Sequence, residues 1–163
     1  MLFRHARPVD KKFILNLYDE VRNAGLISGY SDWNEYYPNE EILDADYREK
    51  GIFVLEENDA VIAAVSLLVT DDLDNEPLNW TCVKSCVPAR LCVSVEYQHK
   101  GIARLVMRNV IAYAQSKGFQ SVRLLASVVN IPANRLYISM GFIKKGNVNL
   151  YDKDFFAYEY VIS

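Results

Sequence analysis

Several features that would place a chain in a specialised class are scarce in this sequence. Only three cysteines occur in 163 residues, namely Cys82, Cys86 and Cys92. Their number is odd and they lack the paired spacing of a zinc site, so we expect reduced thiols and neither a disulfide framework nor a structural metal. No apolar run approaches the roughly 20 residues that cross a bilayer, and basic Arg4 and Arg7 stand where a signal peptide would have its apolar segment. The sequence therefore predicts a cytoplasmic protein with no membrane partner.

An excess of positive charge is also missing. The chain has 18 lysines and arginines against 21 aspartates and glutamates, which gives a net charge of −3. A protein that binds nucleic acid usually concentrates basic residues, so we expect no nucleic-acid partner. The composition, with 51% apolar and 24% charged residues, is that of an ordinary globular protein. Since the length fits one domain and no internal repeat is found, residues 1–163 are expected to form a single domain.

The chain is organised around residues 90–118. Residues 90–95 are mostly apolar and β-branched and predict a buried strand, while residues 103–117 have the spacing of an amphipathic helix that ends at Gly118. Between them, Gly101 and Ala103 keep side-chain bulk low. The first turn of a helix has N–H groups without intrahelical partners and the positive end of the helix dipole. This turn is therefore a candidate phosphate site, although a glycine there is also typical of a plain turn.

The other elements follow from apolar periodicity and from turn residues. Strands are expected at residues 2–7, 52–56, 61–69, 121–128, 142–150 and 155–162, with turns at 57–60 and 152–154. Helices are expected from Asp10 to Ala24, closed by Gly25, from Asn39 to Gly51, and over residues 132–139. The strand, helix and strand of residues 90–128 predict a right-handed crossover and hence a parallel strand pair.

A long connection, residues 71–88, is predicted between the strand at 61–69 and the central strand. It is either a surface loop near the site or a partly formed strand around residues 80–83. Its acidic residues are Asp71, Asp72, Asp74 and Glu76. We expect them to face solvent, with attraction of a basic substrate as the alternative.

Two separated patterns in the chain resemble those of a known enzyme family. The first, Gln, two residues, Gly, one residue and Ala, is formed by Gln98, Gly101 and Ala103 after the central strand. The second is formed by Asn130, Ala133, Tyr137, Gly141 and Phe142. Together and in this order, they resemble the GCN5-related N-acetyltransferase (GNAT) family over nearly the whole chain. The resemblance implies a mixed α/β fold, in which helices flank a mostly antiparallel central sheet with one parallel pair at the cofactor site.

The resemblance also implies acetyl-coenzyme A as cofactor. Backbone groups of alternate strand residues would lie beside the pantetheine arm, and amides of the turn would hold the pyrophosphate. The residues expected to bind the cofactor are Leu91, Val93, Val95, Gln98, His99, Lys100, Gly101, Ile102, Ala103, Arg104, Asn130 and Ala133. For Lys100 and Arg104, the alternative is that they only form the exposed face of the helix.

Tyr137 is the candidate catalytic residue, because it matches the family tyrosine that protonates the departing thiolate. A phenol with a pKa near 10 stays protonated at neutral pH and can serve as such an acid, although a tyrosine at this spacing can also simply pack in the core. The attacking amine must lose a proton, to a water chain or to a side chain. The candidate bases are Glu96, His99, Asp32, Glu35 and Glu40. The region just before the strand, where many relatives have a base, is Ala89-Arg90 and offers none, and Val95 replaces a proline common in the family.

The predicted function is direct acetyl transfer to a primary amine of a small molecule or peptide. Variable segments would bind the acceptor, at residues 26–38, 71–88 and 147–156. The aromatic residues Tyr30, Trp33, Tyr36 and Tyr37 could stack on it or hold an ammonium group, or could instead pin a helix to the sheet. Of these, Tyr30, Trp33 and Tyr37 are the candidate substrate-binding residues. The alternative function is a non-catalytic acyl-coenzyme A-binding regulatory module. The identity of the amine and the oligomeric state, a homodimer included, stay open.

Overall fold

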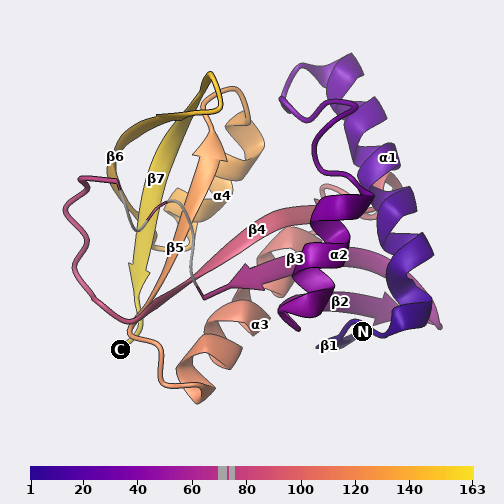
Figure 1. The fold of residues 1–163 in the computed structure, drawn as a ribbon, viewed down its shortest axis with the longest axis horizontal. Coiled ribbons are helices and arrows are strands. Elements are labelled where there is room, and N and C mark those ends of the chain that lie inside the picture. The colour runs from indigo at the N-terminus through magenta and orange to yellow at the C-terminus, as the bar shows by residue number, and fades with distance from the viewer. Residues whose placement is uncertain (70–72, 74–75) are drawn as a thin grey trace.

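One mixed sheet runs through the computed structural model, which describes residues 1–69, 73 and 76–163 (Figure 1). Its seven strands lie in the order β1-β2-β3-β4-β5-β7-β6. The strands are β1 (Leu2–His5), β2 (Ile52–Glu57), β3 (Ala60–Leu68), β4 (Ser85–Val93), β5 (Ser121–Ser127), β6 (Ile143–Leu150) and β7 (Lys153–Val161). The helices are α1 (Lys11–Ser28), α2 (Glu40–Arg48), α3 (Ile102–Ser116) and α4 (Ile131–Ser139), with short 3-10 turns η1 (Pro8–Asp10) and η3 (Val95–Tyr97).

The pair formed by β4 and β5 divides the sheet. These strands pair in parallel at Ser85↔Ser121 and Cys86↔Val122 and at no further described residue. Figure 1 shows that they begin side by side near the C-terminus and then diverge. All other neighbouring pairs of described strands are antiparallel. The predicted mixed sheet with one parallel pair is therefore confirmed.

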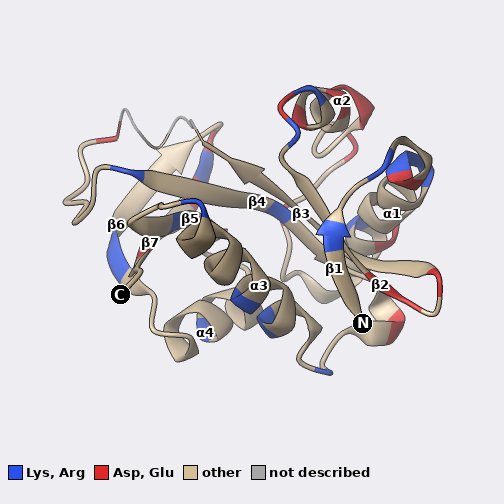
Figure 2. Cartoon of the chain, turned by 90° about the horizontal axis from the view of Figure 1, so that it is seen from below, with Lys and Arg blue, Asp and Glu red and all other residues tan. Residues whose placement is uncertain are grey.

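Helices cover both faces of the sheet. Figure 2 shows α1 and α2 on one side and α3 and α4 on the other. Val106, Met107 and Val110 recur along α3 with helical spacing and are buried in the larger core. On the opposite face, Ile14 of α1 and Leu43 of α2 are buried in a second core. The sheet is thus the middle layer between two helical layers.

Strand β3 is buried on both faces. Val65 and Leu67 belong to the core on the α3 side, while Ala64 belongs to the core beneath α1 and α2. A strand covered on both sides cannot alternate between apolar and polar residues. This explains the nearly continuous apolar run that predicted the strand.

The end of α1 differs from the prediction. Gly25 was expected to close the helix, but it lies inside α1, which continues to Ser28 and ends at Gly29 with a φ of 72°. A Cβ added to Gly25 would lie 2.6 Å from Cβ of Ser31. Gly25 therefore allows the chain after α1 to pack closely against the helix, and Gly29 supplies the left-handed conformation of the cap.

The start of β4 also differs. The strand was predicted from residue 90, but it begins at Ser85, inside the segment predicted as a connection. Pro88 hid this part of the strand, since proline is usually excluded from central strands. Val95 lies beyond the strand in η3. Residues 80–83 form no strand, and Asp71, Asp72 and Asp74 lie outside the described residues.

The other turns and caps mostly follow the prediction. Asn39 caps α2, since its Oδ1 accepts a hydrogen bond of 2.9 Å from the N–H of Ile42. Asn58 and Asp59 have positive φ and form the predicted turn between β2 and β3. The final turn is centred on Tyr151 and Asp152, so that β7 begins at residue 153 and not at 155. No helix among the described residues combines the length and apolarity needed to span a bilayer.

Candidate active site

A cleft of about 720 Å³ opens where β4 and β5 diverge. Residues 87–91 of β4 and 125–127 of β5 form two of its walls. Helix α4 contributes Ala133 and Tyr137, and the segment between α1 and α2 contributes residues on the opposite side. The cleft is therefore built at the one place where neighbouring strands of the sheet leave each other unpaired. Volumes of this size are typical of sites for small molecules and cofactors.

Tyr137 reaches this cleft from α4. Only 8% of the residue is exposed, and its ring packs against the rings of Phe142 and Tyr158 at centroid distances of 5.6 and 6.2 Å. Burial raises the pKa of Tyr137 to about 12, and the nearby Tyr158 adds to this effect. The hydroxyl has no hydrogen-bond partner among the described residues. A protonated phenol is therefore available to a group bound in the cleft.

Asparagine side chains hold α4 at the end of β5. Asn130 caps the helix, with its Oδ1 accepting from the N–H of Ala133 at 3.1 Å. Asn134 is buried, donates to the carbonyl of Ser127 at 2.9 Å and accepts from the hydroxyl of Tyr158 at 2.7 Å. Sequence reasoning missed Asn134. The signal for it was a polar residue near Tyr137 on the inward face of a predicted helix.

The turn before α3 has the geometry of an anion site. Gly101 adopts a φ of 79° and His99 a φ of 60°. Gly101 is the N-cap of α3, so no side chain caps the helix. A Cβ built on Gly101 would meet no atom within 4 Å, so glycine is needed there for its conformation and not for space. The N–H groups of Ile102, Ala103 and Arg104 are left to the solvent or to a ligand.

Three side chains tie this turn to the rest of the fold. Gln98 donates through Nε2 to the carbonyl of Val93 at 3.1 Å, and Arg104 donates to Oγ of Ser139 in α4 at 2.7 Å. Glu20 of α1 accepts from the N–H of Val95 at 2.8 Å, a contact that sequence reasoning missed. His99 and Lys100 are exposed on the same turn. The binding roles predicted for these residues stay predictions.

Strand β4 carries a bulge beside the cleft. Ala64 pairs with Cys92 and Ser66 with Ala89, so β4 has one more residue than β3 between these pairs. The extra residue brings Arg90 to a φ of 54°. Leu91 then lines the cleft, while Val93 is buried in the core. Of the three strand positions predicted to contact the cofactor, Leu91 is thus the one that lies in the cleft wall.

A buried ion pair fixes the side chain of Arg90. Its Nε and Nη2 donate to the two carboxylate oxygens of Asp46 at 2.8 and 2.6 Å, and Ser66 donates to the same carboxylate at 2.6 Å. Nη1 donates to the hydroxyl of Tyr37 at 3.3 Å. The ion pair and this hydrogen bond raise the pKa of Arg90 despite its burial. The network connects α2, β3 and β4 to the aromatic side of the cleft.

The aromatic residues predicted to bind the acceptor separate into two groups. Trp33 and Tyr37 line the cleft, with Trp33 edge-on between Tyr18 and Tyr37 at centroid distances of 5.8 and 6.5 Å. Tyr30 does not line the cleft and is 47% exposed, because it directly follows the cap of α1. Tyr36, from the same aromatic group, also lines the cleft. The binding role predicted for Tyr30 stays a prediction, with the side chain outside the cleft wall.

Among the five candidate bases, only Asp32 lines the cleft. Its Oδ2 accepts from the hydroxyl of Ser127 at 2.8 Å, which places the carboxylate beside the end of β5. Glu96 and His99 lie on the exposed turn before α3, and Glu35 and Glu40 are exposed. The described residues contain no group of three His, Cys, Asp or Glu side chains suited to a metal ion.

Comparisons with known proteins agree with this geometry. The chain is 32% identical to N-acetyltransferase 8B of Rattus norvegicus over 99 residues. The aligned segment covers 61% of this chain and 42% of the relative. It is 41% identical to N-acetyltransferase family 8 member 3 of the same organism over 56 residues. This aligned segment covers 34% of this chain and 25% of the relative. The chain thus spans less than half the length of these curated relatives.

The fold also occurs in solved structures. A GNAT-family acetyltransferase from Streptococcus agalactiae superposes with a TM-score of 0.87 at 17% identity, over 99% of this chain and 95% of that one. The sequence profile of the acetyltransferase (GNAT) family matches residues 14–142, which include α3, β4, β5 and Tyr137. The match thus covers the elements that build the cleft, and the chain belongs to the GNAT family of acetyltransferases.

Proposed function

We propose that this chain is an acetyl-coenzyme A-dependent N-acetyltransferase that transfers the acetyl group directly to a primary amine of a small molecule or peptide. The observation that carries the proposal is the buried, protonated Tyr137 in the cleft between the diverging strands. Coenzyme A, when bound, supplies the acetyl group as a thioester. The chain must then hold the cofactor, accept a proton from the amine and protonate the sulfur.

The residues present fit coenzyme A. The uncapped N-terminus of α3 offers several N–H groups to a pyrophosphate, and no acidic residue lies in the first turn to repel it. The open space above Gly101 allows a phosphate group to approach the backbone. Asn130 and Ala133 line the cleft at the start of α4, the helix that also carries Tyr137.

Asp32 is the residue that we assign to the amine. Its carboxylate lines the cleft, and Oδ1 has no hydrogen-bond partner among the described residues, while Oδ2 is held by Ser127. A carboxylate can attract the substrate as an ammonium group, which must release one proton to solvent before its nitrogen can attack. The neutral amine then attacks the thioester, and Asp32 accepts the proton that the nitrogen loses as the C–N bond forms. As the C–S bond breaks, Tyr137 donates its proton to the sulfur. The two residues thus remove one proton and supply one, so the exchange is balanced.

Replacement of Tyr137 by phenylalanine tests the proposal. The ring and its packing are kept and only the hydroxyl is lost, so we expect kcat to fall about 100-fold or more, within the usual range of general acid catalysis. The dissociation constant of coenzyme A should change less than twofold. The measurement is release of free thiol from acetyl-coenzyme A with a panel of small amines and of peptides with free N-termini.

Two results would contradict the proposal. An unchanged kcat, or an equal loss of kcat and of cofactor affinity, would exclude the acid role of Tyr137. Binding of acetyl-coenzyme A without thiol release with any acceptor of the panel would instead support a regulatory binding module. Thermal unfolding with and without coenzyme A reports binding independently of turnover.

A further inference from the structure

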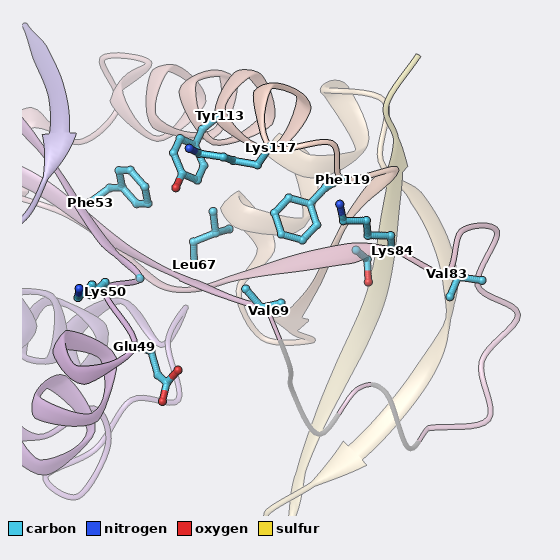
Figure 3. Close-up of a pocket in the computed structure, with 12 residues that line it drawn as sticks. Glu49, Lys50, Phe53, Leu67, Val69, Val83, Lys84, Tyr113, Lys117 and Phe119 are labelled. Atoms are coloured by element: carbon cyan, nitrogen blue, oxygen red, sulfur yellow. The ribbon is translucent and has the colours of Figure 1, made fainter.

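A second cavity of about 570 Å³ lies away from the cleft (Figure 3). It is enclosed by the start of β2, the end of β3, the start of β4 and the C-terminal end of α3. The two cavities share no lining residue. Leu67 of β3 and Val69, just after the strand, line this pocket, while Leu68 lines the cleft. Since successive side chains of a strand point to opposite faces, the two cavities lie on opposite faces of the end of β3. The pocket is therefore a site separate from the proposed acetyl-transfer cleft.

Positive charge is concentrated at this pocket. Lys50, Lys84 and Lys117 line it, whereas Glu49 is the single acidic residue among the described residues that line it. None of the three lysines forms an ion pair with a carboxylate among the described residues, although the whole chain has a net charge of −3. Cations that face a cavity without such partners favour an anionic ligand.

The walls of the pocket are aromatic and apolar. Phe53 and Tyr113 pack edge to face at a centroid distance of 4.7 Å, and Phe119 lies across Leu67 from them (Figure 3). Lys117 Nζ lies 5.4 Å from the ring centroid of Tyr113, and Lys84 Nζ lies 5.5 Å from that of Phe119. Each of these two cations is thus next to a ring surface inside the same cavity.

We infer that this pocket binds a small aromatic anion, such as an aryl sulfonate or an aryl carboxylate. The aromatic body would contact Tyr113, Phe119 and Leu67, and the anionic group would pair with Lys84 and Lys117. The volume lies within the range of roughly 300–1,000 Å³ that small-molecule pockets have. A charged group and a ring are both required, because the pocket offers cations and apolar surface together.

A simpler explanation is that the lysines only cover the rings by cation–π contacts. Such contacts are weak at exposed sites, and both lysines are exposed. They would also be satisfied without a cavity, as at Lys12, whose Nζ lies 4.9 Å from the ring of Phe13 on the surface of α1. Cation–π contacts alone therefore do not explain why a cavity lies beside Lys84 and Lys117.

A matched pair of probes tests the inference. The probe 8-anilinonaphthalene-1-sulfonate carries the anionic group, and N-phenyl-1-naphthylamine has the same rings without it. Fluorescence titration is made on protein saturated with coenzyme A, which occupies the proposed cleft. We expect the sulfonate to bind at one site with at least tenfold higher affinity than the neutral amine. The double substitution Lys84→Glu and Lys117→Glu should weaken sulfonate binding at least tenfold and change binding of the neutral probe less than threefold.

The control is Lys12→Glu, which makes the same charge change at a lysine that covers a ring outside both cavities. It should alter sulfonate affinity less than twofold. Circular dichroism and the midpoint of thermal unfolding report whether the variants fold. If the double charge reversal does not fold, the milder double substitution Lys84→Gln and Lys117→Gln takes its place. Displacement of the sulfonate by coenzyme A would overturn the inference. Unchanged sulfonate affinity in the lysine variants that fold would overturn it as well.

Discussion

Two residues far apart in the chain line the same cleft. Asp32 comes from the segment after α1, and Tyr137 comes from α4. Burial raises the pKa of the Tyr137 phenol and keeps it protonated, while Ser127 orients the Asp32 carboxylate. The arrangement separates a proton acceptor from a proton donor, as transfer from an amine to a thioester requires.

Replacement of Asp32 by asparagine should lower kcat/KM for the amine about 10- to 100-fold, because the amide keeps the shape of the side chain but neither attracts an ammonium group nor takes up its proton. Steady-state kinetics at saturating acetyl-coenzyme A measure the effect. The matched control is Glu35→Gln, an exposed acid three residues away that does not line the cleft. An equal effect of both substitutions would assign the loss to general electrostatics.

At the scale of residues, local patterns predicted the glycine turn before α3 and the candidate acid Tyr137. They did not predict the hydrogen-bond partners of the site residues. Gly101 and Tyr137 were found from spacing and resemblance. Gly101 lies at the N-terminus of α3 and Tyr137 lines the cleft, while their roles stay predictions. The contact between Asp32 and Ser127 joins residues 95 positions apart, so no local pattern could indicate it. Tyr30 was chosen with Trp33 and Tyr37 because all are aromatic, but side-chain direction after the helix cap decides which of them reaches the cleft.

Helix α2 and the bulge of β4 act as one unit at the scale of elements. Asp46 is only 4% exposed and accepts hydrogen bonds from Arg90 and Ser66. Arg90 has a positive φ, a conformation that costs of order 1–3 kcal/mol in a non-glycine residue. The buried ion pair keeps Arg90 in this conformation and so maintains the β4 wall of the cleft.

Asp46→Ala should therefore lower the free energy of unfolding by about 3–5 kcal/mol, because it leaves the Arg90 guanidinium buried without its partner. Urea denaturation measures the change. Asp19→Ala is the matched control, since it removes the partner of Arg22 from an exposed pair on α1 and should cost about 1 kcal/mol or less. Similar costs for the two variants would show that the Arg90 pair adds nothing beyond a surface contact.

The errors in predicted elements have tertiary causes. Gly25 resembles a helix terminator in sequence, but its role is the close approach of Ser31. Residues 85–87 resemble a loop because they precede Pro88, yet they belong to β4, and Ser85 and Cys86 form the parallel pairing with β5. In each case, the deciding contact comes from another part of the chain.

At the scale of the whole molecule, the sheet separates two hydrophobic cores. Cys86 lies in the core on the α3 side and Cys92 in the core beneath α1 and α2, and both are free thiols. Burial raises the pKa of each thiol from its ordinary value of 9.0 to about 12. The folded protein therefore keeps these protons at a pH where the unfolded chain loses them.

This difference predicts a loss of stability at alkaline pH. A raised pKa in the folded state contributes stability that is complete below the unfolded value and declines as pH rises toward the folded value. Between pH 9 and 11, each thiol should remove roughly 2–3 kcal/mol from the free energy of unfolding. The wild type and Cys92→Ala are compared by urea denaturation at about pH 9 and about pH 11. The free energy of unfolding should decline less between these pH values in the variant than in the wild type. Cys82→Ala, at a half-buried thiol, should keep the wild-type decline, and parallel curves for all three proteins would contradict the prediction.

The sequence by itself determined the family, the mixed sheet with its parallel pair, the glycine turn before α3 and the acid candidate Tyr137. The parallel pair and the glycine turn follow from apolar periodicity, the handedness of the crossover and the backbone requirements of glycine. The family and the acid role of Tyr137 come from the resemblance of two short motifs to those of the family, and these motifs are local as well. Only the tertiary structure decided that Asp32 lies in the cleft, that Asp46 holds the bulge of Arg90 and that a cationic aromatic pocket lies on the other face of β3. Those features depend on where β4 leaves β5 and on which distant side chains then come within hydrogen-bond distance, and no local pattern in the chain encodes that separation.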